Sequence, residues 1–525
     1  MKTILTPQQM KSADEFAIKT LRIPSLRLME KAGSAVVTEI IHRIHHAQSD
    51  RKHSVVSGSK TVFIFCGKGN NGGDGFVVAR LLGKKNFAVT VVLIESDKDL
   101  SADARANYER IQDHSADRIE ITGFGAFLKR KKKKCDVIVD AMLGTSFRGE
   151  LKGDYRKAVE WCNKRASLKI AVDIPTGLDG ETGQVLSSAF RADVTVTISN
   201  PKIGFYRGRA KEFTGEVVVA DIGIPRKAIT NVNTMLVESA DVQKTFPRRA
   251  INSHKHSVGK IFAIAGSKSM MGAALLCSQS AMRSGAGQVI LAIPDTEYPA
   301  IAKRTLEVMP LGLPATRQGS IAFSAIEEMK QRIGWSNVVL LGCGMSRNAE
   351  TQEVVREVIR TCSRSLVIDA DGLNALTGHL DILKKRRTKN VVLTPHRGEF
   401  SRMVGMAPDM IEENIFSIAS DFAKKFNVVL VVKGAPTFVA HSNGKIFVNS
   451  TGNPGMSTAG SGDVLAGIIA SFIGQGNSAL DASVNGVYIH GRAGDLAAEK
   501  NGIHGMIASD MIHYLPAAIQ GILKQ

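Results

Sequence analysis

The sequence predicts an α/β protein with two domains, each built on a mainly parallel sheet. Three observations support this prediction. The chain has 525 residues, more than a single hydrophobic core usually serves. Short apolar runs alternate with stretches of helical spacing in both halves, which is typical of repeated strand–helix–strand units. Residues 226–249 between the halves are mixed and polar. We therefore place the domains at 1–228 and 246–525, with a linker at 229–245.

The composition is that of an ordinary globular protein, with 44% hydrophobic and 22% charged residues. No apolar run approaches a membrane span and the N-terminus lacks a signal-peptide core, so we expect a cytoplasmic protein. The six cysteines are scattered without a CxxC pair, which favours reduced thiols. Much of the formal charge of +19 lies in short runs such as 129–134 without interleaved aromatic residues. We interpret these runs as solvated surface and expect no nucleic-acid or membrane partner.

The first domain is expected to begin with two helices and to continue as alternating strands and helices. Residues 7–46 have helical spacing, interrupted by a proline within 22–25. The expected strands are 61–65, 89–94, 135–139, 169–172, 193–198 and 216–220. After the first strand, residues 66–75 are rich in glycine and are expected to form a loop before a helix from residue 76.

The glycines of that loop fit a dinucleotide-binding fingerprint. Gly67, Gly69 and Gly72 satisfy GxGxxG between a strand and a helix, and Glu95 closes the next strand. This arrangement predicts a Rossmann-like three-layer sandwich. The segment lacks the Lys-Ser/Thr ending of a P-loop, which excludes that kind of phosphate site.

Acidic residues follow two further strands of this domain. Asp140 ends one strand, and Asp173 ends the next and is followed by Thr176. Because the carboxyl ends of parallel strands face one crevice, Asn71, Asp140 and Thr176 can offer oxygens to one hard cation, with Asp173 beside it. The alternative is that Asp140 and Asp173 only cap the turns that follow them.

The second domain is expected to form a doubly wound sheet. Its strands are predicted at 260–264, 288–293, 338–341, 366–368, 391–393 and 428–432, followed by a hairpin of 437–440 and 446–448. Helical stretches separate these strands, beginning with 272–284. Such alternation implies right-handed crossovers and a parallel sheet.

A loop at 453–463, rich in glycine and followed at once by the apolar run 464–473, predicts an anion site. The first-turn N–H groups of the helix have no intrahelical partner, and glycines let a phosphate approach them. Asp463 beside such a phosphate is suited to take a proton from an attacking hydroxyl. The alternative is a glycine-rich turn in which Asp463 is an ordinary helix-start acid.

Several strings also resemble known families. Residues 460–463 resemble the anion-hole motif of the ribokinase-like superfamily, and 449–463 resemble its NAD(P)H-hydrate dehydratase branch. The strings 369–374, 394–400 and 433–437 occur in that branch's order, whereas 23–30, 70–75, 140–150 and 173–177 resemble NAD(P)H-hydrate epimerases. The departures are His256, Ala265 and Ala459 in place of glycine, and Ser461 in place of the commoner threonine.

The epimerase resemblance implies a site for the hydrated dinucleotides NADHX and NADPHX. The implied contacts are Asn70, Asn71, Gly72, Gly73, Asp74, Gly144, Thr145, Ser146, Phe147, Arg148, Gly149, Glu150 and Asp173. The same resemblance implies that Asn71, Asp140 and Thr176 bind potassium. We further expect Asp173 to assist proton movement at the epimerising carbon.

The dehydratase resemblance implies a second site, with ADP as co-substrate. ADP would contact Lys433, Gly434, Ala435, Pro436, Thr437, Gly460, Ser461 and Gly462, and the hydrated dinucleotide would contact Ala273, Gly344, His396 and Asp463. The alternative for His396 is a structural histidine in the turn after a proline. Asp369 and Asp371 either bind magnesium waters or cap a turn.

Together the two resemblances predict a repair enzyme that epimerises R- and S-NAD(P)H-hydrate and dehydrates the S epimer with ADP, giving AMP and phosphate. Catalysis would rest on Asp463 and Asp173, and we expect a homo-oligomer. One alternative is a ribokinase-like vitamin-type kinase fused to a dinucleotide-binding domain. Another is a basic nucleotide-sensing or nucleic-acid-binding scaffold. The residues do not indicate whether ADP or ATP is the co-substrate, or whether NADHX or NADPHX is the preferred substrate.

Overall fold

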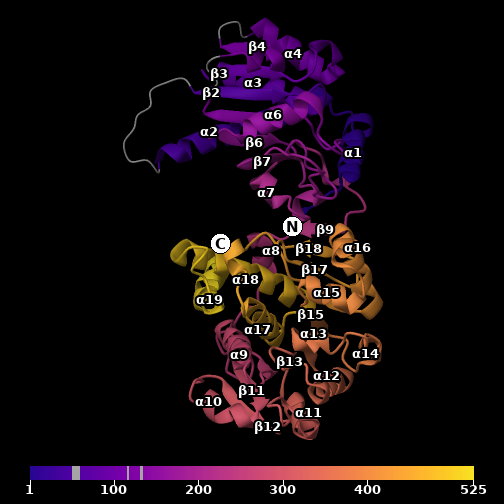
Figure 1. The fold of residues 1–525 in the computed structure, drawn as a ribbon, viewed down its shortest axis with the longest axis vertical. Coiled ribbons are helices and arrows are strands. Elements are labelled where there is room, and N and C mark those ends of the chain that lie inside the picture. The colour runs from indigo at the N-terminus through magenta and orange to yellow at the C-terminus, as the bar shows by residue number, and fades with distance from the viewer. Residues whose placement is uncertain (50–59, 115–117, 131–133, 525) are drawn as a thin grey trace. The chain divides into compact units, whose positions relative to one another are not determined.

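The computed structural model describes residues 1–49, 60–114, 118–130 and 134–524. The chain divides into two compact units (Figure 1). One comprises Thr3–Val232, and the other comprises Asn233–Gln525 together with Met1–Lys2. None of the helices in the described residues is both long and apolar enough to cross a membrane. All six cysteines are free thiols, as predicted.

The N-terminal unit is built on a parallel sheet. Within the described residues its strands are β2 (Thr61–Cys66), β3 (Ala88–Leu93), β4 (Ile119–Gly123), β5 (Val137–Ala141), β6 (Leu168–Val172), β7 (Val194–Ile198) and β8 (Glu216–Ala220). Their order is β4-β3-β2-β5-β6-β7-β8, and every neighbouring pair is parallel. The chain changes direction across the sheet between β2 and β5, which is the point where such sheets bind ligands.

Helices cover both faces of this sheet. They are α1 (Pro7–Glu15), α2 (Ser25–Ser49), α3 (Asn70–Lys84), α4 (Ala102–His114), α5 (Phe124–Leu128), α6 (Gly153–Asn163) and α7 (Lys211–Thr214). Alternate residues of β2 face opposite ways, as strand geometry requires. Val62 and Ile64 pack with α2, α3 and α4, whereas Phe63 and Phe65 pack with α5 and α6. This confirms the predicted three-layer sandwich.

The start of α3 differs from the prediction. The helix begins at Asn70, so three glycines expected in a loop lie in its first turns. A Cβ on Gly72 would lie 1.9 Å from the carbonyl oxygen of Gly67, and one on Gly75 would lie 2.7 Å from both Ala141 Cβ and Cys66 Sγ. These glycines permit close packing of the helix against the sheet, a function that their sequence pattern does not distinguish from a turn.

The C-terminal unit contains the larger sheet. Its strands include β10 (Lys260–Ile264), β11 (Gln288–Pro294), β12 (Met309–Leu313), β13 (Val338–Leu341), β14 (Ser365–Ile368), β15 (Val391–Leu393), β16 (Val429–Val432), β17 (Phe438–Ala440) and β18 (Ile446–Val448). The order from β18 is β18-β17-β16-β15-β14-β13-β10-β11-β12, parallel from β16 to β12. The doubly wound sheet is confirmed, with its switch point between β10 and β13.

The strands of this sheet that were not predicted include β9 and β12. β12 contains Pro310 and Gly312, which argue against a strand, but it lies at the sheet edge, where a missing N–H is tolerated. Residues 234–245, expected within the linker, form β9 (Thr234–Leu236) and α8 (Ser239–Thr245). β9 pairs with β18. Three residues are too few to show a strand period in the sequence.

The remaining helices flank the C-terminal sheet (Figure 1). They are α9 (Met271–Arg283), α10 (Tyr298–Ala302), α11 (Ile326–Trp335), α12 (Ala349–Thr361), α13 (Asp371–Asn374), α14 (Ile382–Lys385), α15 (Arg397–Val404), α16 (Pro408–Phe426), α17 (Ser461–Gly474), α18 (Ala479–Asn501) and α19 (Ala508–Leu523). Residues 464–473 of α17 are all buried, and this helix packs closely on α9. Its backbone approaches α9 at Gly467, where a Cβ would lie 2.1 Å from Cys277 O and Ser280 Oγ.

We expect Gly467→Ala to destabilise the C-terminal unit by about 1–3 kcal/mol, because the added methyl group must push α17 and α9 apart. Denaturant unfolding followed by circular dichroism measures the change. The control is Gly521→Ala in α19, where a Cβ meets no atom within 4 Å. That change should be neutral or stabilising by up to about 1 kcal/mol. Equal effects of the two substitutions would contradict the packing explanation.

Candidate functional site

The first group of polar residues lies at the carboxyl ends of β2, β5 and β6. Asp140 lies inside β5 and is fully buried. Its carboxylate accepts hydrogen bonds from Thr176 N at 2.7 Å, Thr176 Oγ1 at 2.7 Å and Met142 N at 3.2 Å. Burial raises the pKa of Asp140 to about 6, although these hydrogen bonds act to lower it. The bonds to backbone N–H groups fit the turn-capping interpretation of Asp140.

The loop after β5 joins the three residues predicted to bind a cation. Leu143 N donates to Thr176 Oγ1 at 3.0 Å, and Asn71 Nδ2 donates to Leu143 O at 3.1 Å. Asn71, Asp140 and Thr176 therefore lie around one short segment of chain. Their amide, carboxylate and hydroxyl oxygens are the donor types that hard cations prefer. The donor set fits a cation that would balance the buried charge of Asp140.

Asp173 follows β6 and occupies a left-handed backbone conformation, with φ of +65°. Such a φ is uncommon for a residue with a side chain and is often found at functional sites. Its Oδ1 accepts from Ile198 N at 2.9 Å and forms an ion pair with Lys202 Nζ. The Lys202 side chain has no exposed surface. Sequence reasoning missed Lys202, because a single lysine after a strand is ordinarily solvent-exposed.

Two more carboxyl groups interact electrostatically with Asp173. Asp74 in α3 is 6% exposed, and burial, followed by the charges of Asp173 and Asp14, raises its pKa well above the usual value. Burial and the charge of Asp173 raise the pKa of Asp14 in α1 to about 6. Asp74 was predicted as a substrate contact, whereas Asp14 was missed because it occupies an ordinary polar position of a surface helix.

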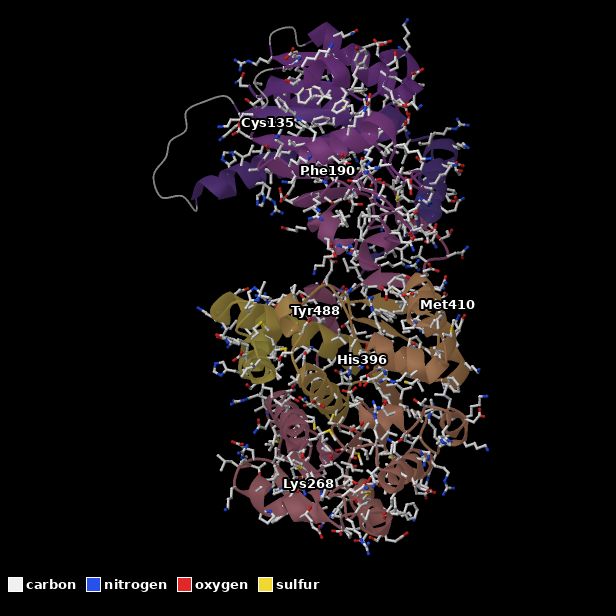
Figure 2. All side chains as sticks on the ribbon, in the orientation of Figure 1. Cys135, Phe190, Lys268, His396, Met410 and Tyr488 are labelled. Atoms are coloured by element: carbon white, nitrogen blue, oxygen red, sulfur yellow. The ribbon has the colours of Figure 1, made fainter. Side chains whose placement is uncertain are left out.

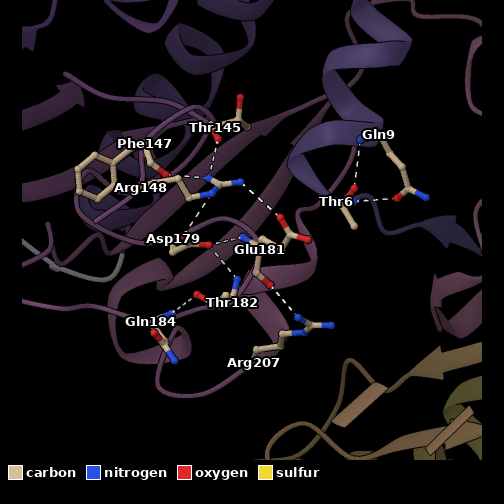
Figure 3. Close-up of polar contacts among 10 residues, drawn as sticks. All are labelled: Thr6, Gln9, Thr145, Phe147, Arg148, Asp179, Glu181, Thr182, Gln184 and Arg207. Atoms are coloured by element: carbon tan, nitrogen blue, oxygen red, sulfur yellow. Dashed lines mark hydrogen bonds and ion pairs between the residues drawn. The ribbon is translucent and has the colours of Figure 1, made fainter. Parts of the chain in front are cut away.

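Arg148 holds the loop 144–150 by several contacts (Figure 3). Its Nη1 donates to Thr145 O at 3.0 Å and to Phe147 O at 2.7 Å. Its Nε lies 3.4 Å from Asp179 Oδ2, and its Nη2 lies 3.5 Å from Glu181 Oε2. The guanidinium thus ties the predicted substrate loop to the turn after β6. These contacts position the loop 144–150.

The second site surrounds the start of α17. Gly460 has φ of +89°, and the helix begins at the next residue, as the anion-site prediction requires. A Cβ on Gly462 would lie 2.9 Å from Lys433 Nζ and 3.6 Å from Asp369 Oδ2. A side chain at position 462 would therefore occupy the space between the helix start, a cation and a carboxylate. The predicted residues Gly462 and Lys433 are brought together here.

Asp463 lies in the first turn of α17, within a buried group of polar atoms. Candidate ligand atoms of Asp463, Cys343 and Asp369 lie within 4.8 Å of one another. Lys433 Nζ donates to Asp369 Oδ1 at 2.6 Å, so an ammonium group already balances this carboxylate. Burial and the charge of Asp369 raise the pKa of Asp463 to about 6, although contacts with Cys343 and Lys433 lower it. A carboxylate with this pKa is well suited to accept a proton near neutral pH.

Ala273 and Gly344, both predicted substrate contacts, are adjacent in space. A Cβ on Gly344 would lie 3.0 Å from Ala273 Cβ. Gly344 has φ of +65°, and its carbonyl accepts a hydrogen bond from Ser267 Oγ at 2.9 Å. The loop after β13 and the start of α9 therefore meet at these two residues. Gly344 is buried, so its lack of a side chain permits the close approach of these two segments at the switch point of the sheet.

His396 (Figure 2) has a structural role that the sequence interpretation left as an alternative. Its Nδ1 accepts from Gly398 N at 3.1 Å and Glu399 N at 3.3 Å, which caps α15. Glu399 completes a capping box by accepting from His396 N at 2.9 Å. The imidazole is about half exposed, at 53%. A ligand contact by His396 would have to use Nε2 or the ring face.

Residues that follow β16 form a turn, and Asp371, which follows β14, accepts capping hydrogen bonds. Gly434 N donates to Thr437 Oγ1 at 3.3 Å, and that hydroxyl donates back to Gly434 O at 3.0 Å, which closes the predicted nucleotide segment into a turn. Asp371 accepts from Ser346 N at 2.9 Å and from Asn374 Nδ2 at 3.1 Å. These contacts match the capping interpretation of Asp371, whereas Asp369 faces Gly462.

Sequence reasoning also missed a histidine beside the helix start. His490 in α18 is 7% exposed, and its Nε2 lies 3.5 Å from Ser461 Oγ. Burial, followed by the charge of Lys433, lowers the pKa of His490 to about 4, so the ring is neutral at physiological pH. Its position in an apolar helix offered no signal that distinguishes it from a core residue.

Comparisons with known proteins cover most of the chain. A family model described as NAD(P)H-hydrate dehydratase matches residues 261–517, and one described as YjeF-related protein N-terminus matches residues 25–204. A bifunctional NAD(P)H-hydrate repair enzyme Nnr of Moorella thermoacetica is 36% identical, over 99% of this chain and 97% of that protein. The protein of the same name from Thermofilum pendens is also 36% identical, over 98% and 95%.

Among solved structures, an ADP/ATP-dependent NAD(P)H-hydrate dehydratase from Bacillus subtilis, co-crystallised with ATP and Mg²⁺, is 27% identical. The matched region covers 54% of this chain and 97% of the Bacillus subtilis chain, and the TM-score is 0.46.

We expect Lys433→Met to destabilise the C-terminal unit by about 3–5 kcal/mol, because Asp369, whose side chain is 1% exposed, would lose its balancing ammonium. Adding Asp369→Asn should restore part of the loss. Denaturant unfolding of both variants measures the effect. Lys384→Met removes an exposed pair with Asp381 and should cost less than about 1 kcal/mol. A similar small cost at both lysines would show that the buried pair is not required.

Proposed function

The chain belongs to the family of bifunctional NAD(P)H-hydrate repair enzymes, and on that premise we propose that each unit carries one of the two activities at the site described above. The N-terminal unit epimerises R- and S-NAD(P)H-hydrate. The C-terminal unit dehydrates the S epimer and so restores the reduced coenzyme. Each site lies at the switch point of its own sheet, where α/β proteins bind nucleotides.

The position of Asp463 carries the proposal for the C-terminal unit. Its carboxylate lies in the first turn of α17, where backbone N–H groups lack intrahelical partners and can hold a phosphate. Asp463 takes the proton from the substrate hydroxyl as that oxygen attacks the terminal phosphoryl group of ADP, releasing AMP. The new phosphate ester then leaves as phosphate, and loss of a proton from the neighbouring carbon forms the double bond.

Charges around the helix start support phosphoryl transfer. The N–H groups after Gly460 stabilise negative charge on the transferring group, which preorganised donors do at little cost. The Lys433 ammonium adds positive charge beside Gly462. Magnesium bound to the nucleotide phosphates would neutralise further charge, and Asp369, which faces Gly462, is the carboxylate suited to hold one of its waters. ADP would lie against 433–437 and the helix start.

The N-terminal site is proposed to bind potassium and the hydrated dinucleotide. Asn71, Asp140 and Thr176 would hold the ion, whose charge would balance Asp140 and attract the dinucleotide phosphates. Residues 70–74 and 144–150 would contact the substrate, the second loop being held by Arg148. Asp173 would accept a proton from the substrate during epimerisation.

In the direct test, purified protein is incubated with mixed epimers of hydrated NADH, potassium, magnesium and either ADP or ATP. Recovery of the reduced-nicotinamide absorbance from both epimers is expected, since epimerisation feeds the R form into dehydration. Recovery of the absorbance from the S epimer alone would contradict the proposal that the N-terminal unit is an epimerase. A stable phosphorylated alcohol in place of restored coenzyme would indicate a small-molecule kinase. Repeating the assay with hydrated NADPH establishes the preferred substrate.

We expect Asp463→Asn to lower the dehydration rate about 100- to 10,000-fold, because asparagine cannot accept the hydroxyl proton. Epimerisation of the same substrate should remain normal, because its site is built from residues of the N-terminal unit. Chromatographic separation of the two epimers measures epimerisation, and coenzyme absorbance measures dehydration. Normal dehydration by the variant would remove Asp463 from the catalytic role.

Dehydration should also depend on pH through Asp463. The raised pKa of about 6 means that the carboxylate is lost as pH falls through 6. The value of kcat/KM, which reports the free enzyme, should therefore be constant above about pH 7 and fall about tenfold per pH unit well below 6. Initial rates over this range test the expectation. A rate that stays constant to about pH 5 would show that no group with this pKa acts as the proton acceptor.

A further inference from the structure

Lys202 is a buried lysine that contacts three hydrogen-bond acceptors of the N-terminal unit. It follows β7, and its side chain has no exposed surface. Lysine is almost never fully buried unless it is paired. The ammonium group donates to Thr197 Oγ1 at 2.9 Å, to Ile198 O at 2.9 Å and to Asp173 Oδ1. An ammonium has three protons, so these three acceptors satisfy it completely.

One carboxyl group contacts this cation, and two more from other elements lie close enough to sense its charge. Asp173 follows β6, Asp14 comes from α1 and Asp74 from α3, and each of the other two senses the charges of Asp173 and Lys202. Carboxylates that share a buried place repel one another, so they cannot all ionise when one ammonium balances them. Lys202 contacts Asp173 directly, so the ammonium stabilises the charged form of that carboxyl group. Burial raises the pKa of Asp74 well above its usual value, which agrees with this arrangement.

Epimerisation requires one group that accepts a proton and another that donates a proton. The hydrated carbon carries both the hydroxyl group and the ring nitrogen. It inverts when the hydroxyl group loses its proton and the carbon–nitrogen bond breaks, which leaves a carbonyl group and a protonated nitrogen, and when the ring then closes on the other face of the carbonyl. An acceptor and a donor are therefore needed in one site. Pairs of titratable groups whose surroundings favour opposite protonation states are the usual solution.

We propose that Lys202 is a positioning residue of the epimerase site, which holds the Asp173 carboxylate in place to accept the hydroxyl proton of the substrate. The buried carboxyl group of Asp74 supplies the proton that the ring nitrogen takes up. Ring closure returns both protons, so each carboxyl group ends in its starting form. The strained backbone of Asp173 is kept by the same contacts, since Ile198 both donates to Asp173 and accepts from Lys202. This inference rests on the epimerase function proposed above.

The test compares Lys202→Met and Lys202→Arg in the full-length chain. Lys202→Met should lower the epimerisation rate at least tenfold, and the acidic limb of its pH profile should move to higher pH. The reason is that Asp173 binds a proton more readily without the neighbouring ammonium. Lys202→Arg keeps the charge and should keep the pH profile. The control is Lys169→Met, because Lys169 Nζ donates to the carbonyls of Arg165 and Ser167.

A lysine that only supports the fold would behave differently. Thermal unfolding and dehydration of pure S epimer show whether each variant is folded. A folded Lys202→Met variant with an unchanged pH profile would overturn the proposal, even if it is slower. A wild-type chain that dehydrates but never epimerises would instead overturn the proposed function.

A second comparison does not depend on changing Lys202. Asp74→Asn removes the candidate donor, and Asp14→Asn is the matched control. Asp74→Asn should lower the epimerisation rate tenfold or more and remove the basic limb of the pH profile, since that limb reports loss of the donor proton, whereas Asp14→Asn should keep that limb. A folded Asp74→Asn variant that retains the wild-type basic limb would overturn the assignment of the donor. This result is informative even if Lys202→Met fails to fold.

Discussion

The C-terminal unit depends on a helix that must be buried along its length and open at its first turn. Residues 464–473 of α17 are buried against neighbouring elements, and Gly467 permits contact with α9. This packing holds the helix start beside Lys433 and Asp369. An anion site needs unpaired N–H groups in a fixed place, and a helix end that moved freely could not provide one. The buried helix therefore supplies both stability and the fixed geometry of the candidate anion site.

The two units use the same arrangement of charge at their sites. In each, an aspartate that follows a strand forms an ion pair with a lysine that follows another strand: Asp173 with Lys202, and Asp369 with Lys433. A buried pair of this kind adds little net stability, because desolvation offsets the attraction. The pair instead places fixed charges at the candidate site. A second carboxyl group senses the charges of each pair, Asp14 and Asp463 respectively, and has a raised pKa.

Much of the architecture could be predicted because the strands are apolar and sharply bounded. β10, β13 and β15 occur where the apolar runs occur. Errors arose where one residue type serves two purposes. Gly72 and Gly75 were read as loop residues but lie in α3, and Pro310 concealed an edge strand. A glycine needed for a turn and one needed for close packing look identical until the partner of the packing contact is known.

By itself the sequence determined the two α/β domains, the family and the helix start at Gly460, because these depend on local spacing and on contiguous strings of residues. It also indicated that Asn71, Asp140 and Thr176 belong together, through the rule that strand ends share an edge. Only the tertiary structure revealed Lys202, Asp14, Cys343 and His490 beside the sites. Each comes from a distant part of the chain with no local pattern, and its burial and charge partners exist only once the chain has folded.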